Sequence, residues 1–224
     1  MADTNSEGSR FAFLVPVRLY GPVVITPKPL MINGKAKGDP EYGTRFFFST
    51  DHPEVKAFAQ TLARIKAGKF GKDAKGVAYP YQMGDAWADK WTAKNGAGKT
   101  NPRDFARGTI IARASSKNFA PMLSYLAGDD IIDIPDEARA GAGGKFYSGV
   151  EALVEVNLVP YEGNGSNIPD CVKAYLTKVC SLGRGDRIGG ASSAQAFAGF
   201  ARNLGAVSDE NPIDEDDELA ALAA

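Results

Sequence analysis

Alternation of apolar and polar residues at every second position is the feature that most constrains the fold of this chain. It is clearest in residues 145–160, KFYSGVEALVEVNLVP. A period of two is that of a β-strand with one buried face. Segments at 10–26, 44–50, 108–114 and 171–182 predict further strands. In residues 145–160, the apolar face consists of Phe146, Val150, Ala152, Val154, Val156 and Leu158.

Helical patterns are fewer. Residues Asp51 to Glu54 fit a capping signature, with an acceptor residue followed three positions later by a glutamate. The helix that follows is expected to end at Gly68, and a short helix is expected around 84–92 and another at 193–204. The first helix should bury one face, made of Val55, Phe58, Leu62 and Ile65.

These elements predict a mainly β protein: an OB-type five-stranded barrel with a long basic insertion and two or three helices. Strands do not alternate with long helices, so a doubly wound sheet is not expected. Residues 27–43, rich in Gly, Pro and Lys, should form a loop, and Pro16 and Pro22 predict a bend or bulge in the first strand. We expect one domain over residues 1–207 and an acidic disordered tail over 208–224.

The charge is divided unevenly, although the formal net charge is −1. Residues 208–224 hold seven acids and no base, which leaves 26 Lys and Arg against 20 Asp and Glu elsewhere. Residues 56–117 hold 13 basic and four acidic residues. This pattern predicts a polyanionic partner and a tail that competes with it; the other explanation is a solvated surface with a solubility tail. The tail residues expected to bind partners are Asp214, Glu215, Asp216, Asp217 and Glu218.

Aromatic residues are interspersed with basic ones in residues 68–107. Lys and Arg match the phosphates of single-stranded nucleic acid, and aromatic rings stack on unpaired bases for roughly 1–3 kcal/mol each. Tyr79 and Tyr81 face the same way in an extended chain, where they either stack on bases or cap a hydrophobic edge. Trp87 belongs either to this surface or to the core. The predicted nucleic-acid-binding residues are Lys72, Lys75, Tyr79, Tyr81, Trp91, Lys99, Arg107, Arg113, Lys117, Lys145 and Tyr147.

Residues 93–100, AKNGAGKT, fit the phosphate-binding P-loop pattern if Ala93 replaces its first glycine. A P-loop needs a buried strand before it and a helix after it, so that loop amides and the helix N-terminus hold the phosphates. The preceding GDAWADKWT is not a buried strand, and no long amphipathic helix follows before Gly108. The segment is better explained as a basic loop, either flexible or in contact with a nucleic-acid backbone.

The chain has few residues suited to metal binding or to acid–base chemistry. The chain has one histidine, His52, and Cys171 and Cys180 form no CxxC pair, so we expect no metal and no cofactor. The acids of residues 128–139, GDDIIDIPDEAR, lie in one local segment that should be a solvated loop, whereas a nuclease needs carboxylates from several elements. We expect a protein that is not an enzyme. Without a long apolar run or a signal segment, we expect no membrane contact and a reducing, cytoplasmic setting.

Four features spanning most of the chain carry a family resemblance. They are the early Phe/Val strand with its Gly-Pro, the helix DHPEVKAFAQTLARIKAG, the block KFYSGVEALVEVNLVPY followed by VKAYLTKVCSLGRGDRIGG, and the acidic C-terminus. In these the chain resembles the single-stranded-DNA-binding proteins of tailed bacteriophages, and most closely a group long catalogued as phage proteins of unknown function.

The resemblance implies an OB-fold that binds single-stranded DNA without strong sequence preference, protecting and organising it during replication and recombination in the cytoplasm of the bacterial host. It also implies a tail that contacts replication proteins, such as a polymerase or helicase, and competes with DNA. Related tails commonly end on phenylalanine, whereas this one ends LAALAA. The alternatives are a recombination or annealing factor, or a nucleotide hydrolase that uses Lys99 and Thr100.

Overall fold

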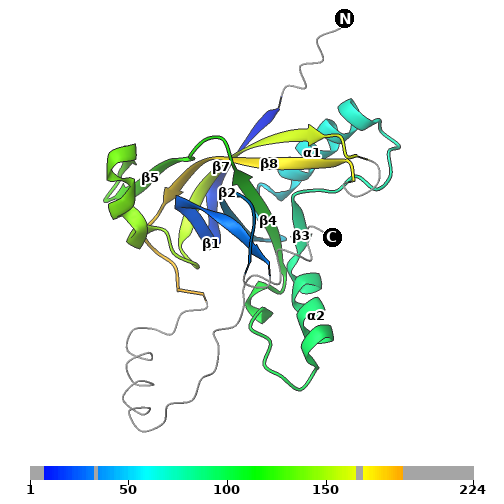
Figure 1. Ribbon diagram of the computed structural model, residues 1–224, viewed down its shortest axis with the longest axis horizontal. Helices are drawn as coiled ribbons and strands as arrows, with labels where there is room; N and C mark the ends of the chain where they lie inside the picture. The colour runs from blue at the N-terminus through cyan, green and yellow to red at the C-terminus, as the bar shows by residue number, and fades with distance from the viewer. Residues whose placement is uncertain (1–7, 33–34, 165–168, 189–224) are drawn as a thin grey trace, which may run out of the picture.

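The computed structural model describes residues 8–32, 35–164 and 169–188 (Figure 1). Its strands are β1 (Ser9–Ile32), β2 (Lys35–Ser49), β3 (Tyr81–Met83), β4 (Thr109–Ser116), β5 (Met122–Ala127), β6 (Asp130–Ile134), β7 (Glu151–Tyr161) and β8 (Cys171–Ser181). Its helices are α1 (Val55–Phe70) and α2 (Gly84–Asn95), with the 3-10 helices η1 (Asp104–Ala106) and η2 (Asp136–Lys145). None of these helices is long and apolar enough to cross a membrane.

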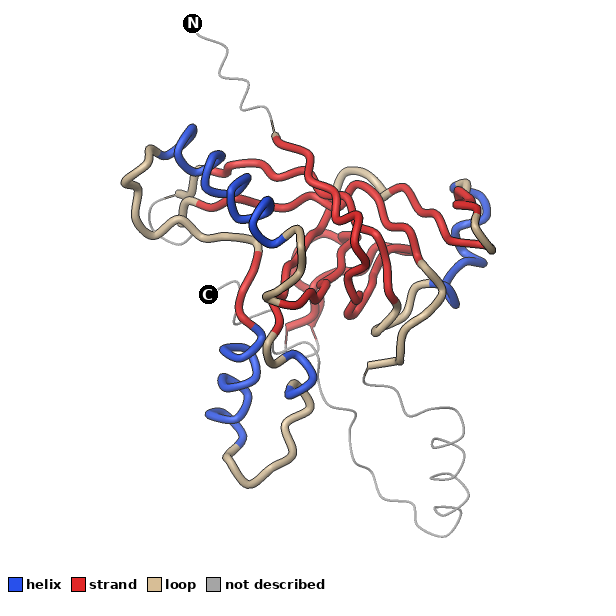
Figure 2. Tube along the Cα trace, turned by 180° about the vertical axis from the view of Figure 1, so that it is seen from behind, coloured by secondary structure: helices blue, strands red, loops and turns tan. Residues whose placement is uncertain are grey.

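The strands form one mixed sheet in the order β3-β4-β2-β1-β7-β8-β5-β6. Neighbours are antiparallel except for β5 and β8, which run parallel. The sheet curls strongly (Figure 2), so that β4 also contacts β8, its distant neighbour in the hydrogen-bonded order. The mainly β prediction is confirmed. The described sheet has eight strands rather than five, because β3, β5 and β6 are too short to show a clear alternation.

The main hydrophobic core lies inside this curl. Every second residue of β7 from Ala152 to Leu158 is buried, as the alternation predicts. Helix α1 closes one end of the core with Phe58 and Leu62, while Val55 and Ile65 pack at its margin. Removing these side chains from water is the main favourable contribution to folding. The predicted inward face of α1 is therefore confirmed.

Residues 27–43 are not the predicted loop. β1 and β2 extend through most of this segment as a long hairpin, in which Lys28 pairs with Glu41 and Ile32 with Lys35. Gly and Pro disfavour strands, but pairing with an adjacent strand overrides such weak preferences. The register shifts at three places along this pair. A further shift between Phe13 and Val17, where β1 meets β7, confirms the bulge expected at Pro16.

The beginning of α1 differs from the predicted capping box. Glu54 is the N-cap, and its side chain makes no capping hydrogen bond to the helix. The Glu54 carboxylate instead accepts hydrogen bonds from the backbone N–H groups of Leu14, at 2.8 Å, and Val15, at 3.3 Å. It therefore stabilises the bulge of β1. The helix also ends at Phe70, two residues beyond the predicted glycine.

Two further boundaries differ from the sequence prediction. Residues 145–150 precede β7 instead of belonging to it, because the chain leaves η2 at Lys145. The acidic segment 128–139 forms β6 and the start of η2 rather than a solvated loop. The short helix expected around 84–92 is confirmed as α2. The helix expected at 193–204 and the tail 208–224 lie outside the described residues.

Candidate nucleic-acid interface

Three adjacent strands bring arginine and aromatic side chains to one face of the sheet. Directly paired residues of antiparallel strands share a face. One such row runs from Arg18 on β1 through Phe47 on β2 to Ile111 on β4, and the next runs from Tyr20 through Arg45 to Arg113. The alternate residues of β2, such as Phe46 and Phe48, point into the core. We call the surface formed by the two rows the outer face.

Helix α2 and η1 cover part of the outer face. Phe47 and Ile111 form a second hydrophobic cluster with Trp87 and Ala106. Trp87 is 4% exposed, so it belongs to the core and not to the accessible surface. Phe105 stays 39% exposed at the edge of the cluster, with its ring 5.6 Å from that of Tyr20 and 5.4 Å from that of Phe47. An aromatic surface therefore remains accessible beside the arginines.

Arg103 joins the outer face from the loop before η1. Its guanidinium lies 4.8 Å from the centre of the Trp87 ring and donates a hydrogen bond to the Trp87 carbonyl oxygen at 3.2 Å. Burial lowers the pKa of Arg103 to about 10; Tyr20 raises it and the like charge of Arg45 lowers it further. Arg103 is therefore still charged at neutral pH. Arg113 pairs with Glu41 at 2.8 Å.

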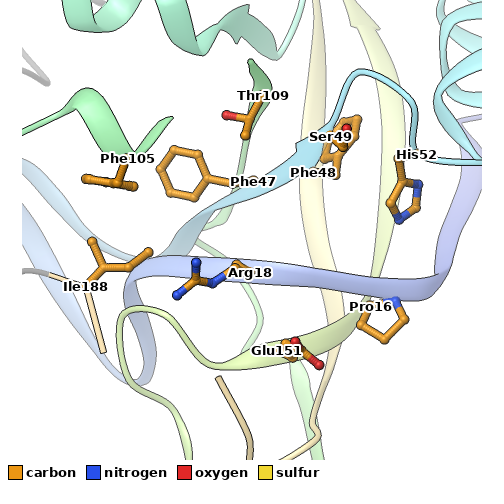
Figure 3. Close-up of a pocket in the computed structure, with 10 residues that line it drawn as sticks. All are labelled: Pro16, Arg18, Phe47, Phe48, Ser49, His52, Phe105, Thr109, Glu151 and Ile188. Atoms are coloured by element: carbon orange, nitrogen blue, oxygen red, sulfur yellow. The ribbon is translucent and has the colours of Figure 1, made fainter. Parts of the chain in front are cut away.

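A pocket of about 290 Å³ opens between the outer face and Phe105 (Figure 3). Half of its lining residues are aromatic or aliphatic, and the other half, which include Arg18, Glu151 and Thr109, are polar or charged. Arg18 donates hydrogen bonds to the carbonyl oxygens of Gly149, at 3.4 Å, and Asp186, at 2.7 Å. The residues that line the pocket are Pro16, Arg18, Phe47, Phe48, Ser49, His52, Phe105, Thr109, Glu151 and Ile188. Such a site suits a flat, partly polar group.

The structure distributes the predicted binding residues over several surfaces. Arg113 lies on the outer face, whereas Lys72 and Lys75 are exposed in the loop after α1. Tyr79 and Tyr81 stack on each other, with centroids 5.8 Å apart and an interplanar angle of 21°. Tyr79 packs against the main core, and the Tyr81 ring lies 6.3 Å from that of Phe58. The tyrosine pair therefore lines the hydrophobic edge near α1 and not the outer face.

Other predicted residues belong to the arm formed by α2 and η1. Trp91 is half-buried on α2, and Lys99 is exposed in the turn that follows. Arg107 contacts three carboxylates, those of Asp89 and Asp104 at 2.8 Å and that of Asp85 at 3.8 Å. The three carboxylates balance the positive charge of Arg107, and these contacts hold the base of the arm in place.

The remaining predicted residues follow β4 or η2. Lys117 is exposed just beyond β4. The Lys145 ammonium lies 3.6 Å from the centre of the Tyr125 ring, and the Tyr147 hydroxyl donates a hydrogen bond to the Gly185 carbonyl oxygen at 2.9 Å. Both side chains thus have contacts within the protein.

The segment AKNGAGKT follows a helix and not a strand. Helix α2 ends at Asn95, and the Gly96 N–H donates to the Thr92 carbonyl oxygen at 2.8 Å. A P-loop fold would deliver the loop from a buried strand, so the geometry does not favour a nucleotide hydrolase. Within the described residues, no group of three or more His, Cys, Asp or Glu is arranged to hold a metal ion.

Sequence reasoning missed Arg18, Tyr20, Arg45, Phe47 and Phe105. One signal was available in TRFFFST, residues 44–50, where three phenylalanines are consecutive. Since successive side chains of a strand point to opposite faces, at least one of the three must face away from the core. That residue is Phe47, and Arg45 shares its face.

Among solved structures, this fold occurs in single-stranded-DNA-binding proteins of bacteriophages. The protein of bacteriophage Enc34 in complex with single-stranded DNA has a TM-score of 0.59 and 15% sequence identity, over 84% of this chain and 97% of that one. A second structure of the Enc34 protein gives a TM-score of 0.56 at 14% identity, over 88% and 97% of the two chains. At this identity the likeness establishes the fold, in agreement with the family resemblance.

Sequence comparisons add no further relative. No family model matches the chain, and no curated protein matches it significantly.

Proposed function

We propose that this protein binds single-stranded DNA without strong sequence preference, and that the outer face is its binding surface. One observation carries the proposal: Arg18, Arg45 and Arg113 share one face of three adjacent strands, and the accessible ring of Phe105 contacts Tyr20 and Phe47 on the same face. Single-stranded DNA offers phosphates and unstacked bases together, which this combination of side chains matches. The structural likeness to a phage protein in complex with single-stranded DNA supports the same conclusion.

The pocket beside Phe105 gives the surface a place for a base. A base that enters it would contact Phe47 and Phe105 and come within reach of Thr109 and Arg18, all of which line the pocket. Beyond the pocket, Arg113, whose side chain is 38% exposed, would contact the DNA backbone. Lys90 and Lys99, exposed on the α2 arm, extend the positive charge along one flank. Contacts to phosphates and base faces are independent of sequence.

We infer that the sheet contains an OB-type barrel. Its strands would be β1, β2, β7 and β8, together with β4 and β5 taken as one. The contact of β4 with β8 and the pairing of β5 with β8 support this inference. In the proposed function the protein is not an enzyme. It protects and organises single strands during phage replication and recombination in the host cytoplasm. The acidic tail contacts replication proteins and competes with DNA.

A salt-titrated binding assay that compares single-stranded with double-stranded DNA tests the function. The expected result is preferential binding of oligo-dT, with an affinity that falls steeply with salt as counterions are released. Quenching of tryptophan fluorescence by oligo-dT would report contact near Trp87, whose ring lies 6.0 Å from that of Phe105. Absence of single-strand binding at about 50 mM salt, where electrostatic attraction is strong, would contradict the proposal.

A further inference from the structure

Strand β6 forms one end of the sheet order and carries exposed aliphatic side chains. Among the described strands it pairs with β5 alone. Ile131 and Ile132 are 58% and 41% exposed, and Met122 on the neighbouring strand is 58% exposed. An edge strand that exposes unpaired backbone groups together with apolar side chains is a ready site for another protein surface.

An apolar groove lies beside this edge. It has a volume of about 250 Å³ and runs between the β5–β6 hairpin and η2. Its apolar lining includes Tyr125, Ile132, Ile134, Pro135 and Ala142. Lys145, whose ammonium lies over the Tyr125 ring, also lines it. The groove is distinct from the outer face, since the two pockets share no lining residue.

The two ends of the molecule carry opposite charge. Residues 122–145, which contain the groove, hold five acids and two bases. Residues 55–80, which contain α1, hold six bases and one acid. The hairpin with η2 and helix α1 lie at opposite ends of the longest axis, with β1, β2 and β4 between them (Figures 1 and 2). A second copy placed end to end would therefore bring unlike charges together.

Helix α1 also has a surface that suits the groove. Its exposed side presents the small apolar residues Ala59, Ala63 and Ala67, next to the exposed cations Lys56 and Arg64. Small side chains allow a helix to approach an apolar groove closely. The cations would then face Asp130 and Asp133, which are exposed on β6.

We propose that the groove between β6 and η2 binds helix α1 of a second copy of this protein, the next one along the same DNA strand. The inference rests on the proposed function. The contact joins two different surfaces, so it can repeat from one copy to the next and extend as an open chain along a strand. It would make binding to long single strands cooperative and leave binding of one copy to a short oligonucleotide unchanged.

Charge exchange tests the contact in the full-length protein. The variants are Asp130→Lys with Asp133→Lys on β6, Lys56→Glu with Arg64→Glu on α1, and all four substitutions combined. Each variant is titrated with an oligo-dT that holds one copy and with a long poly-dT. Either pair alone should lower the cooperativity on poly-dT about tenfold, because like charges then meet across an interface. The fourfold variant restores unlike charges and should recover most of the cooperativity.

The outcomes separate this inference from the proposed function. Cooperativity that is absent in the natural sequence, or equal in all variants, would overturn the contact while short-oligonucleotide binding still supports the function. Groove binding by a different protein would also leave the cooperativity unchanged, and would count against the inference. If the short oligonucleotide does not bind, the proposed function is wrong. Sedimentation at low salt then tests the contact by itself, and a natural protein that stays monomeric overturns the contact.

Discussion

At the scale of single residues, Phe105 is the side chain on which the proposed contact with a DNA base would depend most. It is the accessible member of the aromatic cluster at the outer face, and it lines the pocket. We predict that Phe105→Ala weakens oligo-dT binding roughly tenfold, since one base–aromatic stack contributes about 1–3 kcal/mol. A fluorescence or filter-binding titration at fixed salt measures the change.

Tyr161→Ala is the matched control for this prediction. Tyr161 is 40% exposed, close to the value for Phe105, but lies at the other end of β7 from Glu151. Its removal should leave the affinity unchanged. Equal losses in the two variants would show that Phe105 has no special contact with a base.

Arg113 and Arg107 allow a second comparison, because both were expected from the sequence to contact nucleic acid. Arg113 lies on the outer face, whereas Arg107 contacts Asp85, Asp89 and Asp104. We predict that Arg113→Gln makes the negative slope of log affinity against log salt shallower by about 0.7, the value for one lost phosphate contact on a single strand. Arg107→Gln should change the slope less. A larger change for Arg107 would place the interface on the α2 arm.

At the scale of elements, the attachment of α2 to the sheet depends on Gly84. A methyl group at this position would collide with the carbonyl oxygen of Ala106 in η1. Alanine normally stabilises a helix relative to glycine by about 1 kcal/mol. We predict the opposite sign for Gly84→Ala, a destabilisation of roughly 1–3 kcal/mol, as for other overpacked sites. Urea denaturation measures it.

Gly98→Ala provides the control on the same arm. A methyl group there meets no atom within 4 Å, so the stability should not fall. Gly84→Ala should also weaken DNA binding, because Phe105 directly precedes Ala106 in η1. A stable Gly84→Ala variant with unchanged affinity would mean that the close packing of α2 on the sheet is not required.

At the scale of the whole molecule, the charge division predicts how the tail acts. Deletion of residues 208–224 removes seven acids and changes the formal net charge from −1 to +6. We predict tighter binding of oligo-dT at low salt, with a difference that shrinks as salt screens the charges. Titration of both forms at two salt concentrations measures it. Replacing the seven acids by Asn and Gln should have the same effect as the deletion, and equal affinity at low salt would contradict competition by the tail.

Alternation in the sequence was enough to locate the long strands and the inward face of α1, because burial of one face imposes a period that local sequence retains. It was not enough for β3, β5 and β6, which are short. Nor could it find the hairpin at residues 27–43, whose composition is typical of a loop. In these segments, pairing with a distant or adjacent strand outweighs local preference.

The sequence by itself determined that this chain is mainly β, that its charge is divided, and that its basic region is rich in aromatic residues. Only the tertiary structure decided which of those residues share a surface. Arg18, Arg45 and Arg113 are far apart along the chain and come together because their strands pair in one register. Register depends on backbone hydrogen bonds and core packing between distant segments. The composition of one segment contains no record of these contacts.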